Sequence, residues 1–274
     1  MSELQRAFDA HLHIIDPNHP LIENHGFLPD PFTVADYRAR LRSLPQTGVQ
    51  VVGGAVVSGS FQGFDQGCLI EALRQLGPNY VGVTQLPAET TDDQILRLDE
   101  AGVKALRFNI ARGGSARLDA LDGFARRVHD IAGWHAELYI DARTIDDDLA
   151  DRIASLPAVS IDHLGMHSDG LLTLLRLVER GVKVKATGFG RVELDPAEAI
   201  RRIVDTDPNA LMVGTDLPST RARRPFADAD LALILQVLDP AEADAVFWTN
   251  AANFYGVGSD RGPSAASPSS SMPG

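Results

Sequence analysis

The feature that most constrains the fold of this chain is a regular alternation of short β-type runs with amphipathic helical stretches. Eight runs rich in apolar and β-branched residues have the length of strands and lie at 7–13, 49–57, 80–85, 103–108, 136–140, 159–163, 182–187 and 211–215. Between them, seven stretches have helical periodicity, at 33–44, 65–76, 92–101, 118–132, 145–155, 171–180 and 197–205. Because parallel strands need a crossover between them, this alternation predicts a parallel sheet. Eight such units in 274 residues predict a single (β/α)₈ TIM barrel.

The ends of several elements carry recognisable signals. Thr33 and Asp195 are predicted helix N-caps, the second followed by a proline at the first helical position, and Gly102 and Gly181 are predicted to end helices. Two more helical stretches, 227–238 and 240–255, would close the barrel and add a small extra helix. From residue 257 the chain is rich in Gly, Pro and Ser without apolar anchors. We therefore expect a barrel domain over residues 1–256 and a disordered tail over 257–274.

Composition restricts the partners and the compartment. The chain is 44% hydrophobic, enough for a sizeable core, and its formal net charge of −12 would repel nucleic acid and anionic lipid. Cys68 is the only cysteine, so neither an intrachain disulfide nor a thiolate metal cluster can form. The N-terminus has no apolar signal region, and no run of about 18 apolar residues occurs. We expect a soluble cytoplasmic protein that acts on a small molecule, with no nucleic acid or membrane partner.

Polar side chains follow the predicted strands where a barrel of this type carries its chemistry. In such barrels the functional groups come from the carboxyl ends of the strands and the loops that follow them. The strand ends here supply His11 and His13, then Arg107, Tyr139, His163, Arg191 and Asp216. Because side chains two apart on a strand share a face, His11 and His13 are both expected to face the interior.

Each of these side chains has a structural interpretation as well as a functional one. A lone His-x-His pair is weak evidence, since a buried histidine is usually only hydrogen-bonded in place. Asp216 follows an apolar run, where burying its charge without a partner would be costly, although it could also cap a loop helix. Asp162 is expected to point to the opposite face from His163 and to be structural. The agreement among the strand ends favours function for the four residues His11, His13, His163 and Asp216.

Six ordered motifs carry a family resemblance. They are FDAHLH at 8–13, SFQGFD at 60–65, LRFN at 106–109, IDHLG at 161–165, KATGFGR at 185–191 and GTDLP at 214–218. In this combination the chain from Phe8 to about Tyr255 resembles the amidohydrolase superfamily, in the amidohydrolase 2 branch that contains 2-pyrone-4,6-dicarboxylate lactonase and sugar lactonases. The resemblance implies a barrel hydrolase that opens lactones, which are cyclic carboxylic esters, with water.

The resemblance also implies roles for individual residues. His11, His13 and His163 match the histidines around the scissile carbonyl, and Asp216 matches the carboxylate that activates water. Five more residues match positions that hold the substrate in that lactonase: Ser60, Arg107, Arg112, Tyr139 and Arg191. The chain departs from the lactonase at Met166, where an arginine is expected. Because a thioether cannot replace a guanidinium fork, the substrate is expected to be a lactone with one carboxylate or a hydroxyl-rich sugar lactone.

The sequence leaves the metal question open. An arginine at the end of the fourth strand cannot be a ligand, which disfavours the binuclear metal site of many relatives. The resemblance favours no cofactor, but His11, His13 and Asp216 could hold one divalent ion such as Zn²⁺. The alternatives to lactone hydrolysis are therefore a mononuclear metal-dependent amidohydrolase, a non-oxidative decarboxylase, and a binding barrel without catalysis.

Overall fold

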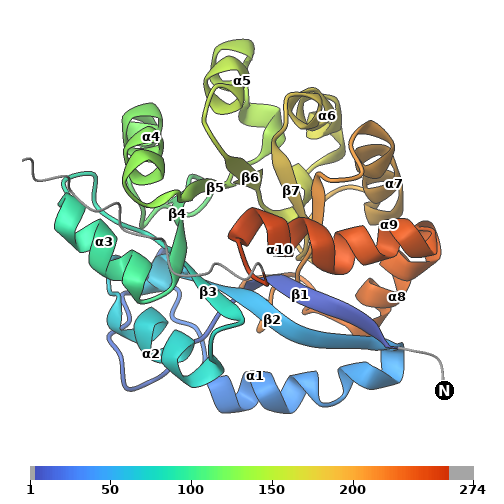
Figure 1. Cartoon of the computed structure of the whole chain (residues 1–274), viewed down its shortest axis with the longest axis horizontal. Coiled ribbons are helices and arrows are strands. Elements are labelled where there is room, and N and C mark those ends of the chain that lie inside the picture. Colours follow the sequence, from blue (N-terminus) through green and yellow to red (C-terminus); the bar gives the residue numbers. More distant parts are fainter. Residues whose placement is uncertain (1–3, 259–274) are drawn as a thin grey trace, which may run out of the picture.

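The computed structural model describes residues 4–258, which form an eight-stranded parallel sheet in sequential strand order (Figure 1). The strands are β1 (Gln5–Leu12), β2 (Val49–Val57), β3 (Tyr80–Thr84), β4 (Val103–Asn109), β5 (His135–Tyr139), β6 (Val159–Ile161), β7 (Lys183–Ala186) and β8 (Leu211–Val213). The helices lie around the outside of the strands (Figure 1). The predicted (β/α)₈ barrel is therefore confirmed.

Each strand leads into a helix that packs on the outer face of the sheet. The helices of the units are α1 (Val34–Leu41), α2 (Gly67–Leu76), α3 (Asp92–Glu100), α4 (Leu121–Ala132), α5 (Asp147–Ala154), α6 (Leu171–Glu179), α7 (Pro196–Thr206) and α8 (Asp228–Val237). After them come α9 (Pro240–Asp244), a π-helical turn (Ala245–Thr249) and α10 (Asn250–Tyr255). Within residues 4–258, no helix combines the length and the apolar character needed to cross a bilayer. The predicted tail at 257–274 lies, except for its first two residues, outside the described residues.

The predicted helix signals act as expected. The Thr33 side chain accepts a hydrogen bond from the backbone N–H of Asp36, whose carboxylate accepts one from the Thr33 backbone N–H in return. Asp195 accepts from the backbone N–H of Ala197, with proline at the first helical position. Such caps satisfy backbone donors that the first turn of a helix leaves unpaired. They fix where α1 and α7 begin.

Two apolar regions surround the strands. The larger one fills the layer between the sheet and the helices, and the smaller one plugs the amino-terminal end of the barrel interior. In this plug the Phe8 and Tyr255 rings stack with their centroids 5.3 Å apart, and His135, at the start of β5, lies against Tyr255. Helix α10 thus covers the amino-terminal end of the barrel (Figure 1). Only the carboxyl-terminal end is left for a polar site.

Asp9 joins the first and last strands. Its carboxylate accepts hydrogen bonds from the Thr215 backbone N–H at 2.8 Å, the Thr215 hydroxyl at 2.7 Å and the Tyr37 hydroxyl at 3.0 Å. The backbones also meet beyond the strand ends, where the N–H of Asp216 donates to the carbonyl of His11 at 2.7 Å. Gly214 permits this approach, because a Cβ there would lie 2.8 Å from the His11 nitrogen. Closure of the barrel therefore fixes His11 and Asp216 side by side.

We predict that Asp9 makes the folded state lose stability as the pH rises from about 4 to about 6. Burial raises the pKa of Asp9 from 3.8 to about 6, so the unfolded chain ionises first and folding becomes less favourable through this interval. Relative to Asp9→Asn, the free energy of unfolding of the wild type should fall by about 2–3 kcal/mol. Urea unfolding of both proteins at several pH values measures the difference. If the free energy of unfolding changed with pH in the same way for both proteins, the pKa of Asp9 would not be raised in the folded state.

Candidate active site

The carboxyl-terminal end of the barrel brings together the four residues singled out from the sequence. His11, His13, His163 and Asp216 are each at most 5% exposed. The His11 ring lies 5.0 Å from the His13 ring and 4.9 Å from the His163 ring, measured between centroids. Asp216 Oδ1 lies 3.7 Å from His13 Nε2 and 3.9 Å from His11 Nε2. Three imidazoles and one carboxylate therefore face one small space.

His13 has one ring nitrogen fixed and the other directed into this space. Its Nδ1 lies 2.7 Å from the carbonyl oxygen of Val57 at the end of β2. Because a carbonyl only accepts, Nδ1 carries the proton of that bond. In the neutral ring, Nε2 would then present a lone pair towards Asp216 Oδ1, which is also an acceptor. A proton donor or a cation between the two atoms would satisfy both.

Asp216 is held as a carboxylate. Arg191 donates to its Oδ2 from Nε at 2.9 Å and also from its terminal nitrogen. Burial alone would raise the pKa of Asp216, but the charge of Arg191 holds that pKa well below its usual range. Oδ1, in contrast, is buried with no hydrogen-bond partner among residues 4–258. It is free to accept a proton or bind a ligand.

His163 is an uncharged imidazole on a tight turn after β6. The strand ends at Ile161, and His163 and Leu164 take left-handed backbone angles, with φ of 53° and 52°. Burial and the charge of Arg191 lower the pKa of His163 to about 3. Gly188 allows the close packing, since a Cβ there would lie 2.7 Å from His163 Nδ1. A neutral His163 can donate a hydrogen bond without adding a buried charge.

The expected outward orientation of Asp162 is wrong. Asp162 is completely buried and accepts a hydrogen bond from Arg107 at 2.8 Å, and its other oxygen lies 3.3 Å from His11 Nδ1. The alternation of faces fails because the strand stops at Ile161 and the chain turns, which brings Asp162 and His163 to the same interior. Asp162 is thus placed to orient His11, as a carboxylate beside a functional histidine often does.

A second charged pair beneath the histidines was missed in the sequence. Glu137 on β5 and Lys185 on β7 form an ion pair with no exposed side-chain surface. Lys185 Nζ lies 3.8 Å from Asp162, and Arg107 Nε lies 3.5 Å from Glu137. Burial and the neighbouring charge of Asp162 raise the pKa of Glu137 to about 7. Glu137 is the one carboxylate within the run HAELY of β5, and Lys185 is the inner of two lysines on β7. A charge in such a run signals a buried partner, because an isolated buried charge is costly.

The cavity above these groups has a lining rich in hydrogen-bond donors. All five residues expected to hold a substrate line it, namely Ser60, Arg107, Arg112, Tyr139 and Arg191, together with His13 and His163. Most hydrogen-bonding capacity of Arg107 is used within the protein, because it donates to the carbonyl of Ser58 at 2.9 Å as well as to Asp162. Met166 is not part of the lining.

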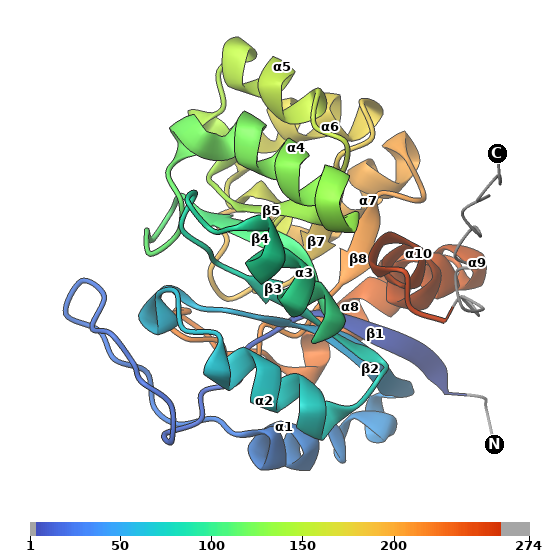
Figure 2. The same cartoon turned by 60° about the vertical axis from the view of Figure 1, so that its left-hand side comes forward.

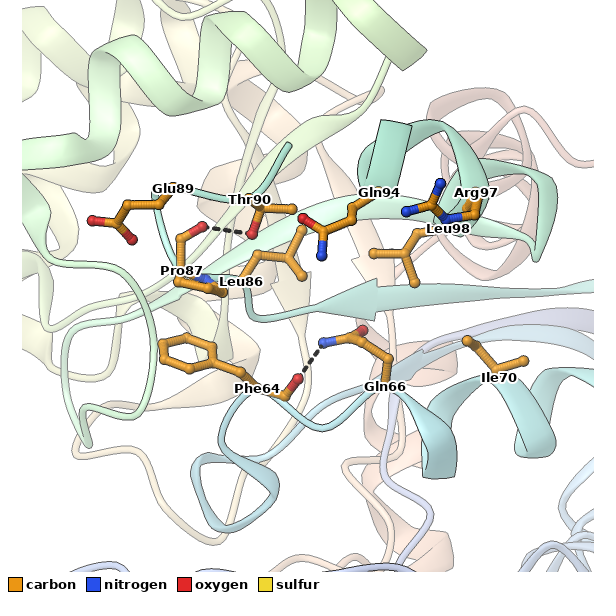
Figure 3. Close-up of a pocket in the computed structure, with 10 residues that line it drawn as sticks. All are labelled: Phe64, Gln66, Ile70, Leu86, Pro87, Glu89, Thr90, Gln94, Arg97 and Leu98. Carbon is orange, nitrogen blue, oxygen red and sulfur yellow. Dashed lines mark hydrogen bonds between the residues drawn. The ribbon is translucent and has the colours of Figure 1, made fainter. Parts of the chain in front are cut away.

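A larger hollow lies outside the barrel, between α2 and the loop that leads into α3 (Figure 3). Its lining is mainly apolar and amide side chains, including Phe64, Ile70, Leu86 and Leu98. Figure 3 shows hydrogen bonds there only from Thr90 to Pro87 and from Gln66 to Phe64. None of the residues expected to take part in catalysis lines this hollow.

The geometry of the site could accommodate one metal ion. His11, His13 and Asp216 offer ligand atoms within 4.8 Å of one another, and His11, Asp162 and His163 form a second such set. In the set of His11, His13 and Asp216, His11 Nε2 and Asp216 Oδ1 are buried without a hydrogen-bond partner, as metal ligands would be before the ion binds. Charge weighs against it, because Asp162, Glu137 and Asp216 are already matched by Arg107, Lys185 and Arg191. A divalent cation would leave the interior with surplus positive charge.

Comparison with known proteins identifies the family of this chain. The amidohydrolase family model matches residues 8–257. The chain is 24% identical over 253 residues to a 2-pyrone-4,6-dicarboxylate hydrolase of Comamonas testosteroni, covering 82% of this chain and 81% of that protein. It is 25% identical over 250 residues to a D-galactarolactone isomerase of Agrobacterium fabrum, covering 84% of this chain and 82% of that protein.

A solved structure shares the fold. It is a probable 2-pyrone-4,6-dicarboxylic acid hydrolase of Acinetobacter baumannii with citric acid bound, with a TM-score of 0.77 at 20% identity over 91% of this chain and 99% of that chain. The chain belongs to the amidohydrolase family, and we class it as a hydrolase.

We predict that Lys185→Met lowers the free energy of unfolding by about 3–5 kcal/mol, because it leaves Glu137 and Asp162 as buried carboxylates with one cation too few. Adding Glu137→Gln to this variant should recover part of the loss. The control is Lys183→Met, two residues away on the same strand, where a half-buried pair with Asp207 at 3.5 Å should contribute at most about 1 kcal/mol. Urea unfolding measures all three variants. Equal effects at both lysines would contradict the proposed charge balance.

Proposed function

We propose that the protein hydrolyses the ester bond of a small lactone that is anionic or rich in hydroxyl groups. The observation that carries the proposal is the unpartnered Asp216 Oδ1, which lies within 4 Å of the Nε2 atoms of His11 and His13. Asp216 and His11 lie just behind the lining of the arginine-rich cavity, which His13, His163 and Arg191 form in part. Membership of the amidohydrolase family supports hydrolysis. The names of both curated relatives refer to lactone or pyrone-carboxylate substrates, which supports a lactone for this chain.

In this mechanism Asp216 takes a proton from water as the water oxygen bonds to the lactone carbonyl carbon. His11 and His163 donate to the carbonyl oxygen, so that the negative charge of the tetrahedral intermediate develops among prepared donors, while the lone pair of His13 Nε2 faces the attacking water beside Asp216 Oδ1. The bond between the carbonyl carbon and the ring oxygen then breaks, and the proton on Asp216 passes to the leaving oxygen. The product is an open-chain hydroxy acid.

Substrate binding at Arg191 would change how strongly Asp216 attracts a proton. A carboxylate whose pKa lies far below neutrality is a weak base, and Arg191 is a main cause of the low pKa of Asp216. A substrate carboxylate that attracts the guanidinium would weaken this hold and make Asp216 more basic. Ser60, Tyr139 and Arg107 would orient the rest of the substrate, and Arg112 would meet a group near the mouth of the cavity.

If the protein binds a metal, His11, His13 and Asp216 would hold it, with His163 nearby. Such an ion would polarise the carbonyl or lower the pKa of bound water. The three balanced ion pairs of the interior favour the metal-independent reaction instead. A second candidate, rearrangement of one lactone into another, is supported by the similarity to the galactarolactone isomerase.

We predict that Asp216→Asn keeps substrate binding but lowers kcat by about 10²–10⁴-fold, because the amide cannot accept the proton of water. Steady-state kinetics on a lactone found by screening sugar lactones, muconolactones and pyrone carboxylates would measure this. The control is Asp141→Asn, which removes a carboxylate that pairs with Arg143 outside the cavity and should retain full activity. Near-normal kcat in folded Asp216→Asn would rule out Asp216 as the base.

We also predict that removal of divalent metal leaves kcat within about twofold of the untreated enzyme, since neither base nor carbonyl activation requires an ion in this mechanism. Dialysis against a chelator, with elemental analysis of the protein before and after, provides the measurement. Loss of activity that stoichiometric Zn²⁺ restores would replace this mechanism with the metal-dependent one.

A further inference from the structure

The hollow between α2, α3 and the loop that leads into α3 has a volume of about 570 Å³. Figure 2 shows α2 and α3 one above the other on the outer face of the barrel. Leu86, Pro87 and Leu98 form much of the apolar lining, and no residue of the hollow also lines the cavity at the barrel end. Exposed apolar surface of this kind often marks a contact with another molecule. The hollow is therefore a candidate contact surface, separate from the proposed reaction.

Two large apolar side chains lie at opposite ends of the hollow. Phe64 is at one end and Ile70 at the other (Figure 3), and they are 46% and 38% exposed. The Gln66 side chain donates to the backbone carbonyls of Phe64 and Gln85, at 3.0 and 3.1 Å, which fixes the chain where Phe64 is attached. Phe64 therefore stays at the rim and does not fill the hollow. A partner that covered both side chains would remove apolar surface from water, which is favourable.

Two opposite charges occupy the same two ends. Glu89 lies at the left-hand end in Figure 3 and Arg97 at the right-hand end, and both are exposed. Neither forms an ion pair within residues 4–258, whereas Asp92, on the same stretch of chain, is paired with Arg127. The hollow thus has an unused negative charge at one end, an unused positive charge at the other, and apolar side chains between them.

The two ends of the hollow complement each other. In a twofold contact between identical chains, a residue at one end of the surface meets the residue at the other end of the second copy. Rotation about an axis through the middle of the hollow would set Glu89 of one copy against Arg97 of the other, and this contact would occur twice. It would also bring each Phe64 ring towards an Ile70 side chain. A hollow with charges of one sign would not have this property.

We propose that this hollow is the contact surface of a twofold symmetric homodimer. The net charge of −12 opposes association of two copies, so a dimer requires a local surface whose charges attract. The hollow offers such a surface, with apolar side chains between the opposite charges. None of its residues takes part in the proposed lactone hydrolysis, so the dimer and the reaction can be tested independently.

Sedimentation equilibrium of the full chain tests for the dimer. Over concentrations of about 1–200 μM at physiological salt, the mass should rise from the 29.5 kDa of one chain towards twice that value. A wild type that stays monomeric throughout this range overturns the proposal. Binding of an apolar dye to such a monomer, abolished by Ile70→Asp, would assign the hollow to a small molecule instead.

Charge reversal tests which surface is used. Glu89→Arg should weaken dimerisation at least about tenfold, because it places two arginines opposite each other in both symmetry-related contacts. Arg97→Glu should have the same effect. The double variant Glu89→Arg/Arg97→Glu restores opposite charges and should dimerise within about threefold of the wild type. The control is Glu179→Arg, an equal reversal at an exposed position on α6, which should dimerise as the wild type does.

These variants change exposed side chains, so their melting temperatures should stay within about 3 °C of the wild type. A wild-type dimer that Glu89→Arg leaves intact would show that another surface is used, and would overturn the proposal. A double variant as weak as either single variant would also overturn it, because the two charges would then not face each other across the axis.

Discussion

Mutual neutralisation of three carboxylates and three cations inside the barrel is the interaction on which the site depends. Asp162 with Arg107, Glu137 with Lys185, and Asp216 with Arg191 each combine an acid on or after one strand with a base on or after another. Any one of these charges alone would be costly to bury. Together they allow a polar interior above an apolar plug. Burial lowers the pKa values of His11 and His163, so these imidazoles are uncharged among the ion pairs.

The charged residues that position His11 are different from the residues that we propose take part in the reaction. The lower groups, Glu137, Lys185 and Asp162, lie beneath His11 and hold it from one side. The upper groups keep atoms without a hydrogen-bond partner or with a free lone pair, among them Asp216 Oδ1 and His13 Nε2, and His13 lines the cavity. Closure of the sheet through Asp9 and Thr215 sets the distance between β1 and the residue that follows β8. The position of the proposed base relative to the proposed electrophilic histidines is therefore a consequence of how the barrel closes.

The sequence predicted the barrel and the meeting of the histidines with Asp216, because strand periodicity and strand-end chemistry are local patterns. It could not predict the side to which Asp162 points, since that depends on where β6 stops and on positive φ angles at His163 and Leu164. Lys185 and Glu137 were visible as charges in strand runs, but they meet inside the barrel across β6, which lies between their strands.

The central claim is that water, activated among these groups, opens a lactone ring. Mass spectrometry of the product formed in H₂¹⁸O tests it most directly. Attack of water on the carbonyl carbon places one ¹⁸O atom in the new carboxylate of each product molecule, and the account predicts this incorporation in a single turnover. A product that forms at the enzymatic rate without any ¹⁸O would show that the ring is rearranged rather than hydrolysed, and would contradict the claim.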